Sequence, residues 1–231
     1  LLFLPTLRGV PRSPAQAVAG SWSRPLVEGA RYTFGEPLIR RLLMLHVASA
    51  TLARPFLDFV PALATQLFQG GATHAAALTR ASGAGAVAGG LWLAQRDTRR
   101  PLLPVVLGAM AALAALLIAL AWTPWFAVSL VLALAAGFCM ITRAAAMQTL
   151  IQAVATPPMR GRAVSFYALI LNAGSIVGAL VIGALAETLG LSWGLTIAIG
   201  AALLAWWLLK TPLQRAAAAH PLTGEGLRDA R

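Results

Sequence analysis

The sequence predicts an all-α membrane protein with six transmembrane helices arranged as a three-plus-three inverted repeat. Three observations support this prediction: an apolar composition, six apolar segments of membrane-spanning length, and an order of polar side chains that recurs after the third segment. Of the 231 residues, 59% are hydrophobic and 11% are charged, against roughly 25% charged residues in a typical soluble domain. The composition therefore excludes a water-soluble globular protein.

The distribution of apolar residues divides the chain into an N-terminal region (1–41), a membrane domain (42–209) and a cytoplasmic tail (210–231). The chain opens with apolar residues followed by Arg8 and Arg12, as at the end of a membrane helix, so we expect a preceding membrane segment. The polar stretch that follows is typical of a cytoplasmic linker. Its apolar residues recur near helical spacing, which predicts a short amphipathic helix against the inner membrane surface.

Six uninterrupted apolar segments make up the predicted membrane domain. A bilayer core about 30 Å thick requires about 20 apolar residues in each helix that crosses it. Each segment is near this length, and short polar or turn-rich connectors separate one segment from the next. We therefore expect six crossings, at about residues 42–66, 75–94, 101–122, 125–147, 164–186 and 192–209.

Basic residues collect in the connectors on one side of the predicted membrane domain. The opposite connectors contain no Lys or Arg, apart from Arg80 just inside the second segment. Cytoplasmic loops carry the excess of Lys and Arg, so we expect the basic side and both termini to be cytoplasmic, in a bacterial inner (plasma) membrane. The net charge of +11 then reflects topology, and we expect no nucleic-acid partner. The basic residues of this side are Arg40, Arg41, Arg96, Arg99, Arg100, Arg160, Arg162, Lys210 and Arg215.

The reactive side chains do not form a pattern typical of an enzyme or a metal site. Cys139 is the single cysteine and lies in an apolar stretch, which excludes an intrachain disulfide and a multi-cysteine metal site. The three histidines, His46, His74 and His220, are scattered, and no His or carboxylate cluster has metal-binding or acid–base spacing. We therefore expect no catalytic residue, no metal and no cofactor.

Polar side chains follow the order polar, polar, apolar, twice along the six segments. The third segment (101–122) contains no charged, Ser, Asn or Gln residue, and the sixth (192–209) has only Ser192 and Thr196. Polar groups are costly in hydrocarbon, so we expect the other four segments to line an interior and these two to face lipid. Such a repeat is typical of secondary transporters, although chance also produces this order from six segments.

Two charged residues in the first segment are the strongest candidates for a functional site. Arg54 and Asp58 are four residues apart, which places them on one helical face, and Pro55 and Pro61 predict a bend that frees backbone carbonyls. One hypothesis is that Asp58 exchanges a proton or binds a cationic ligand group during transport, with Arg54 setting its pKa. The alternative is a static ion pair within the helix.

Other polar residues in the segments allow two interpretations each. Asn172 is either a hydrogen-bonding group in the transport cavity or a link between helices. We interpret Arg143, in the inner third of the fourth segment, as snorkelling to the headgroups in preference to binding a ligand. A single His46 is only weak evidence for a proton relay.

Glycine pairs four residues apart predict close contacts between helices. Gly85 with Gly89, and Gly174 with Gly178, have the spacing at which two helix backbones approach each other. Glycine is also common in membrane helices in general. The pairs therefore predict helix packing, with a moving seam as the alternative.

Five segments of the sequence carry a family resemblance: 28–32 (EGARY), 37–41 (PLIRR), 54–61 (RPFLDFVP), 148–152 (QTLIQ) and 160–165 (RGRAVS). Together they resemble the major facilitator superfamily, and in particular its enterobactin-exporter-like branch. The resemblance covers the whole chain as the second half of a twelve-helix transporter, whose seventh, eighth, tenth and eleventh helices line the cavity. It implies cytoplasmic gate loops at Arg96, Arg99 and Arg100 and at Arg160 and Arg162, although the first loop lacks the acid and glycine of the family pattern.

These observations predict a secondary transporter that exports a small molecule by proton-coupled alternating access. Its expected partners are the lipid bilayer, the small-molecule substrate and a missing N-terminal six-helix half. The alternatives are a membrane scaffold that transports nothing and the membrane domain of an ATP-driven exporter. The inner connectors are short and the sequence has no Walker-type phosphate loop, which disfavours the ATP-driven exporter.

Overall fold

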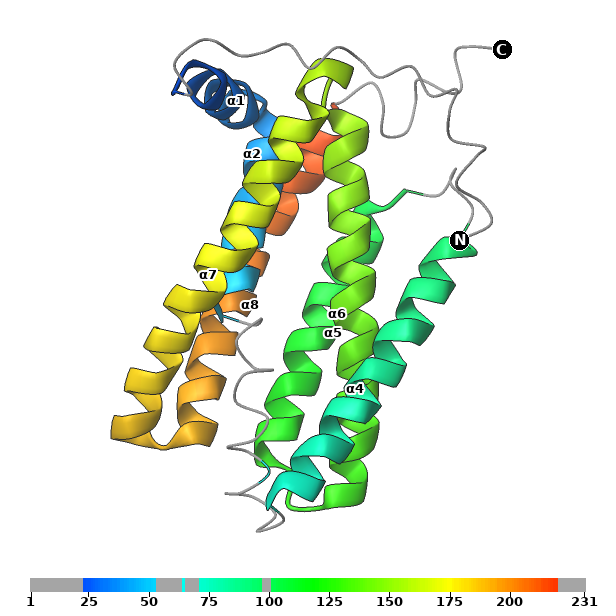
Figure 1. Ribbon diagram of the computed structural model, residues 1–231, viewed down its shortest axis with the longest axis vertical. Helices are drawn as coiled ribbons and strands as arrows, with labels where there is room; N and C mark the ends of the chain where they lie inside the picture. Colours follow the sequence, from blue (N-terminus) through cyan, green and yellow to red (C-terminus); the bar gives the residue numbers. More distant parts are fainter. Residues whose placement is uncertain (1–22, 53–63, 65–70, 97–100, 220–231) are drawn as a thin grey trace, which may run out of the picture.

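The computed structural model describes residues 23–52, 64, 71–96 and 101–219, and all of the secondary structure in these residues is helical. Arg54, Pro55, Asp58, Pro61, Arg99 and Arg100 lie outside them. Figure 1 shows the helices running along the long axis of the molecule, except α1, which lies at one end. The helices are α1 (Ser23–Gly35), α2 (Pro37–Leu52), α4 (Gly71–Ala94), α5 (Leu103–Trp122), α6 (Phe126–Val154), the short η2 (Pro157–Met159), α7 (Arg160–Leu189) and α8 (Leu191–Ala218).

Within the described residues, four helical segments are long and apolar enough to cross a membrane. They are Leu103–Trp122, Phe126–Val154, Pro157–Leu189 and Leu191–Ala218, which correspond to the third to sixth predicted segments. The helix α4 occupies the second predicted segment with 24 residues but is less apolar, because it carries residues such as Thr79 and Arg80. The helix α2 covers the beginning of the first, whose remainder, apart from Ala64, lies outside the described residues.

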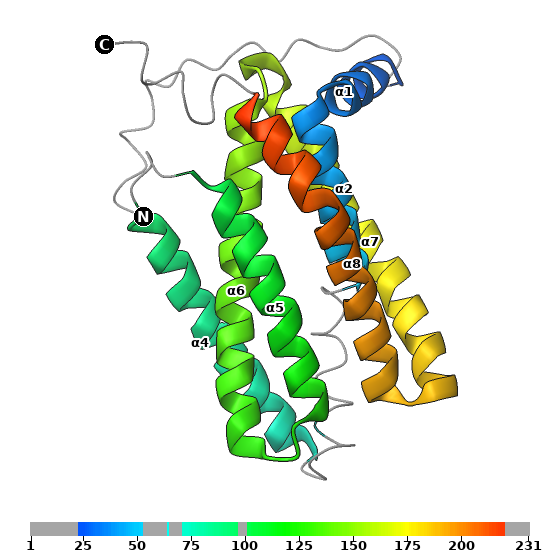
Figure 2. The same ribbon diagram turned by 180° about the vertical axis from the view of Figure 1, so that it is seen from behind.

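The long helices form two groups, which are visible from both sides in Figures 1 and 2. In the α6 group, α6 packs along α4 and α5; in the α2 group, α2 packs along α7 and α8. Contacts between α5 and α8 join the two groups, and α6 also touches α2 and α7. The first helix of each expected repeat thus packs on the second and third helices of the other repeat.

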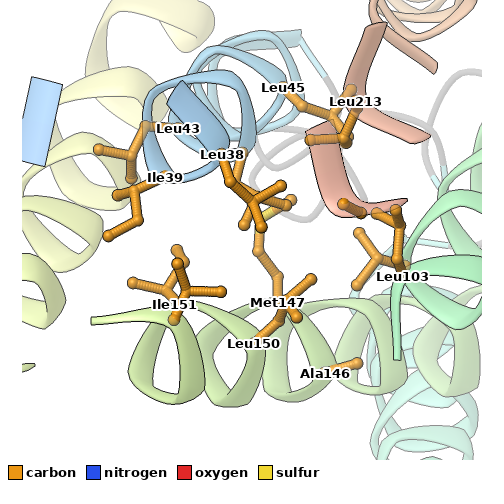
Figure 3. Close-up of a cluster of buried hydrophobic side chains, with 14 of the residues drawn as sticks. Leu38, Ile39, Leu43, Leu45, Leu103, Ala146, Met147, Leu150, Ile151 and Leu213 are labelled. Carbon is orange, nitrogen blue, oxygen red and sulfur yellow. The ribbon is translucent and has the colours of Figure 1, made fainter. Parts of the chain in front are cut away.

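Among the described residues, two clusters of buried apolar side chains hold the helices together. The first cluster joins α2 to α6 and α8: Figure 3 shows Leu38 and Ile39 of α2 beside Met147 and Ile151 of α6, with Leu213 of α8 at the edge. The second cluster is built mainly from α5, α6 and α8. Lipid tails are as apolar as these side chains, so in a bilayer the clusters stabilise the fold through van der Waals packing.

The glycines of α4 lie against the backbone of α6. A Cβ atom added at Gly85 would overlap the carbonyl of Leu134, and one added at Gly89 would lie 2.6 Å from the carbonyl oxygen of Phe138. From the other side, a Cβ at Gly137 of α6 would overlap the carbonyl of Ser82. The two helices therefore touch backbone to backbone, which only glycine permits at these positions.

Between α2 and α7 the contact is less tight. A Cβ atom at Gly174 would lie 2.9 Å from the Cβ of Ala50, and Gly178 is buried in α7. Small residues therefore line this contact as well.

Candidate functional site

The predicted charged pair cannot be placed, since Arg54 and Asp58 lie outside the described residues. The same holds for Pro55 and Pro61, so the pair and the bend stay predictions. Asn172 is described, and its side chain is exposed on α7. Its Nδ2 donates a hydrogen bond to the carbonyl oxygen of Ala168 at 2.8 Å, one turn earlier in the same helix. Among the described residues, this amide links no second helix.

A buried polar group lies instead where three helices from the two groups meet. His46 of α2, Arg143 of α6 and Tyr167 of α7 form this polar junction, and their exposed fractions are 0%, 2% and 4%. The rings of His46 and Tyr167 stack, with centroids 4.0 Å apart and planes 13° from parallel. The hydroxyl of Tyr167 donates a hydrogen bond to the carbonyl oxygen of Ala144 at 3.2 Å. Tyr167 thus connects α2 to α6.

Arg143 gives the polar junction its charge. A guanidinium stays protonated in proteins, and its position allows an electrostatic interaction with the His46 imidazole. An arginine within an apolar span is costly on membrane-insertion scales, by about 2.5 to 3.5 kcal/mol when it lies at the centre of the helix. Such residues face the interior of a bundle or a wet cavity, and they are functional candidates by default.

The structure corrects the interpretation of Arg143 as a snorkelling residue. Its side chain is only 2% exposed, so the guanidinium does not reach the surface of the bundle. The interpretation was wrong because α2 and α7 pack over this part of α6. The sequence did contain a signal for this burial, because an ionisable residue within an apolar segment indicates an interior position.

The described arginines of the expected gate loops make contacts close to their own positions. The Arg96 guanidinium lies 5.2 Å from the centre of the Trp92 ring. The Nε of Arg160 donates a hydrogen bond to the carbonyl oxygen of Ala155 at 3.2 Å. Arg162 reaches further and forms an ion pair with Glu28 of α1 at 3.4 Å. The beginning of α7, where the second expected gate loop lies, is therefore tied to α1, the helix of the predicted cytoplasmic linker.

Another arginine bridges two helices of the α2 group. The Nη1 of Arg41 donates a hydrogen bond to the carbonyl oxygen of Pro212 at 3.0 Å, and thereby joins the start of α2 to α8. Proline lacks the backbone donor of an ordinary helical residue, so a helix is locally weaker around it. Arg41 adds a bond between helices at this point.

Within the described part of the chain, no group of three or more His, Cys, Asp or Glu side chains is arranged to hold a metal ion. Cys139 there is a free thiol. Among these residues, the polar junction is the arrangement best suited to bind a ligand or handle a charge, because it combines one permanent cation, one imidazole and one phenol.

Comparison with known proteins identifies the family. A family of major facilitator proteins described as transmembrane secretion effectors matches residues 10–222. No curated protein matches the chain. The matching family consists of transporters, not enzymes, and its members are multi-pass membrane proteins, in keeping with the apolar helices described above. The match covers far more than half of the sequence, and the chain therefore belongs to the transmembrane secretion effector family of the major facilitator superfamily.

Proposed function

We propose that the chain is the C-terminal six-helix half of a secondary active exporter, which moves a small molecule by proton-coupled alternating access. The family match supports transport and efflux in general. The observation that carries the finer proposal is the burial of Arg143 between the two helix groups, since a charge is retained inside a membrane protein chiefly where it serves a pathway.

The packing of the first helix of each expected repeat on the other repeat supports a three-plus-three inverted repeat. The helix α2 packs on α7 and α8 as α6 packs on α4 and α5, and α5 meets α8. These helix pairs are unchanged when the two sets of three helices are swapped, as expected for repeats related by a two-fold axis in the membrane plane. The packing of α7 on α8 has no equally extensive counterpart between α4 and α5, so the two repeats do not pack identically. In such transporters the site lies near the middle of the membrane, at the interface of the repeats.

Exposed apolar side chains support the proposal that a second, N-terminal half completes the transport cavity. Large apolar side chains are exposed on α7, and they include Leu169 and Ile176, which flank Asn172, at 61% and 66%. In the membrane such a surface meets lipid or another helical domain. We assign Asn172 and its face of α7 to the cavity shared with an N-terminal half, as the resemblance to the enterobactin-exporter-like branch implies.

The distribution of basic residues supports a cytoplasmic location for the end that carries α1. The beginning of α2, the beginning of α7 and the end of α8 lie at this end in Figure 1, and α4 ends in the same half of the molecule. These helix ends carry Arg40, Arg96, Arg162 and Arg215. By the positive-inside rule, we propose that this end faces the cytoplasm of a bacterial cell and that both termini lie there.

Proton coupling is assigned to Asp58, which would gain and lose a proton during alternating access, with Arg54 setting its pKa. The change that tests this role is Asp58→Asn in the full-length transporter. We expect the variant to lose export driven by a proton gradient, because a carboxamide does not titrate near neutral pH and so cannot carry a proton as a carboxyl group does. The measurement is mass spectrometry of the medium of expressing cells, with and without a protonophore.

Glu187→Gln is the matched control, because this acid is exposed at the end of α7 and its loss leaves the proposed pathway intact. Unchanged export and unchanged protonophore sensitivity in Asp58→Asn would contradict the coupling role. If the unmodified full-length protein changes the concentration of no small molecule in the medium, the scaffold interpretation gains instead.

A further inference from the structure

The helix α1 has two different faces. Its inner face packs on the connection between α6 and α7: the Tyr32 hydroxyl accepts a hydrogen bond from the backbone N–H of Thr156 at 2.9 Å. The Glu28 carboxylate pairs with Arg162 at 3.4 Å. The Gly29 backbone lies so close to Arg162 that an added Cβ would be 3.1 Å from its Cδ. The linker helix is therefore docked through several separate contacts.

The outer face of α1 consists of Val27, Arg31 and Phe34. These residues are spaced by four and three positions, which places them in one stripe along the helix, opposite Gly29 and Thr33. Val27 is 63% exposed and Phe34 is 46% exposed, although the Phe34 ring also meets Phe166 edge-on with centroids 5.9 Å apart. Arg31 is exposed between them and forms no ion pair with any described residue.

We propose that this outer face binds the headgroup layer of an anionic phospholipid membrane. A stripe in which a basic residue lies between two apolar residues is complementary to a lipid surface, because the apolar groups enter the acyl boundary while the guanidinium meets phosphate. The helix lies at the end of the bundle, next to the start of the long helix α7 (Figures 1 and 2). An interfacial helix occupies this depth.

The inner contacts give lipid binding a mechanical consequence. The same short helix that touches the membrane holds Thr156 before η2 and Arg162 in the first turn of α7. An anionic leaflet therefore fixes the position of the α6–α7 connection relative to the membrane surface. A neutral leaflet leaves this connection held by the protein contacts alone.

The test places a fluorescent label at position 27, the first apolar position of the stripe. Val27→Cys is made in full-length protein that also carries Cys139→Ala, labelled with an environment-sensitive dye and reconstituted in phosphatidylcholine nanodiscs with or without phosphatidylglycerol. We expect a blue shift of the emission, and quenching by lipids with a spin label near the headgroup, chiefly in the nanodiscs with phosphatidylglycerol. Adding Arg31→Gln should abolish the difference between the two membranes.

Arg215→Gln is the matched control, since this arginine is exposed near the end of α8, at the same end of the bundle, but outside the stripe. It should retain the difference. The proposal is overturned by a water-like emission in both membranes, by an anionic-lipid effect that survives Arg31→Gln, or by equal losses in the two arginine variants. A blue-shifted label that spin-labelled lipids do not quench indicates a covering protein and also overturns it. None of these readouts depends on transport, so the proposed function is tested separately.

Discussion

Export by the full-length transporter is expected to fall by at least about tenfold when Arg143 is replaced by methionine, while the protein remains folded. A tenfold loss of export rate corresponds to about 1.4 kcal/mol of activation free energy. Export should fall because the variant removes the permanent cation of the polar junction. The fold should persist because a long apolar side chain stays in its place. Methionine fills much of the volume of the arginine side chain and adapts to irregular gaps, so we expect the helices around this position to keep their packing.

The measurement therefore has two parts: small-molecule export, and thermal stability of the purified protein in detergent. Arg80→Met is the matched control, because Arg80 is an arginine of a predicted span but is exposed on α4. We expect this variant to keep its export activity. If Arg143→Met retains export, the polar junction has no role in transport; if it loses its fold together with its activity, the junction is structural.

The largest effect on stability is expected for Gly85→Leu in α4. A leucine side chain at this position meets the backbone of Leu134 and Phe138 in α6, and a helix backbone cannot move aside as a flexible side chain does. Overpacking typically costs about 1 to 3 kcal/mol, and this contact lies at the upper end of the range. The melting temperature, followed by size-exclusion chromatography of heated samples, should fall by roughly 10 °C.

Gly83→Leu provides a control in the same helix, two residues away, where an added Cβ has nothing within 4 Å. Its melting temperature should stay within a few degrees of that of the unmodified protein. Equal stability of the two leucine variants would mean that α4 and α6 are not in backbone contact in the membrane.

The sequence predicted the later helices well, because hydropathy reports directly on whether a segment can leave water. The third to sixth predicted segments correspond to α5, α6, α7 and α8. Hydropathy missed how far these helices extend, since a helix continues into water as long as its backbone bonds persist. The helix α6 reaches Val154 and α8 reaches Ala218, past Pro212, each beyond its apolar segment.

The partner of each helix was harder to predict, because apolar surfaces in lipid are nearly equivalent and only their shapes decide which of them meet. Arg143 illustrates the difficulty. Its position in the sequence suits a side chain that reaches the headgroups, and its burial depends on α2 and α7, which lie far away in the chain. A polar residue in an apolar segment therefore indicates a special environment without telling which one.

The exchange of partners between the two groups also constrains the order of events during synthesis. The helix α2 ends at Leu52, yet its main packing partners begin only at Arg160. At about 5 to 20 residues per second, a ribosome needs on the order of ten seconds to produce the intervening chain. During this time a nascent α2, with His46 on its buried face, lacks its main packing partners. We therefore expect a chaperone, an insertase or another helix to cover this face until α7 and α8 are made.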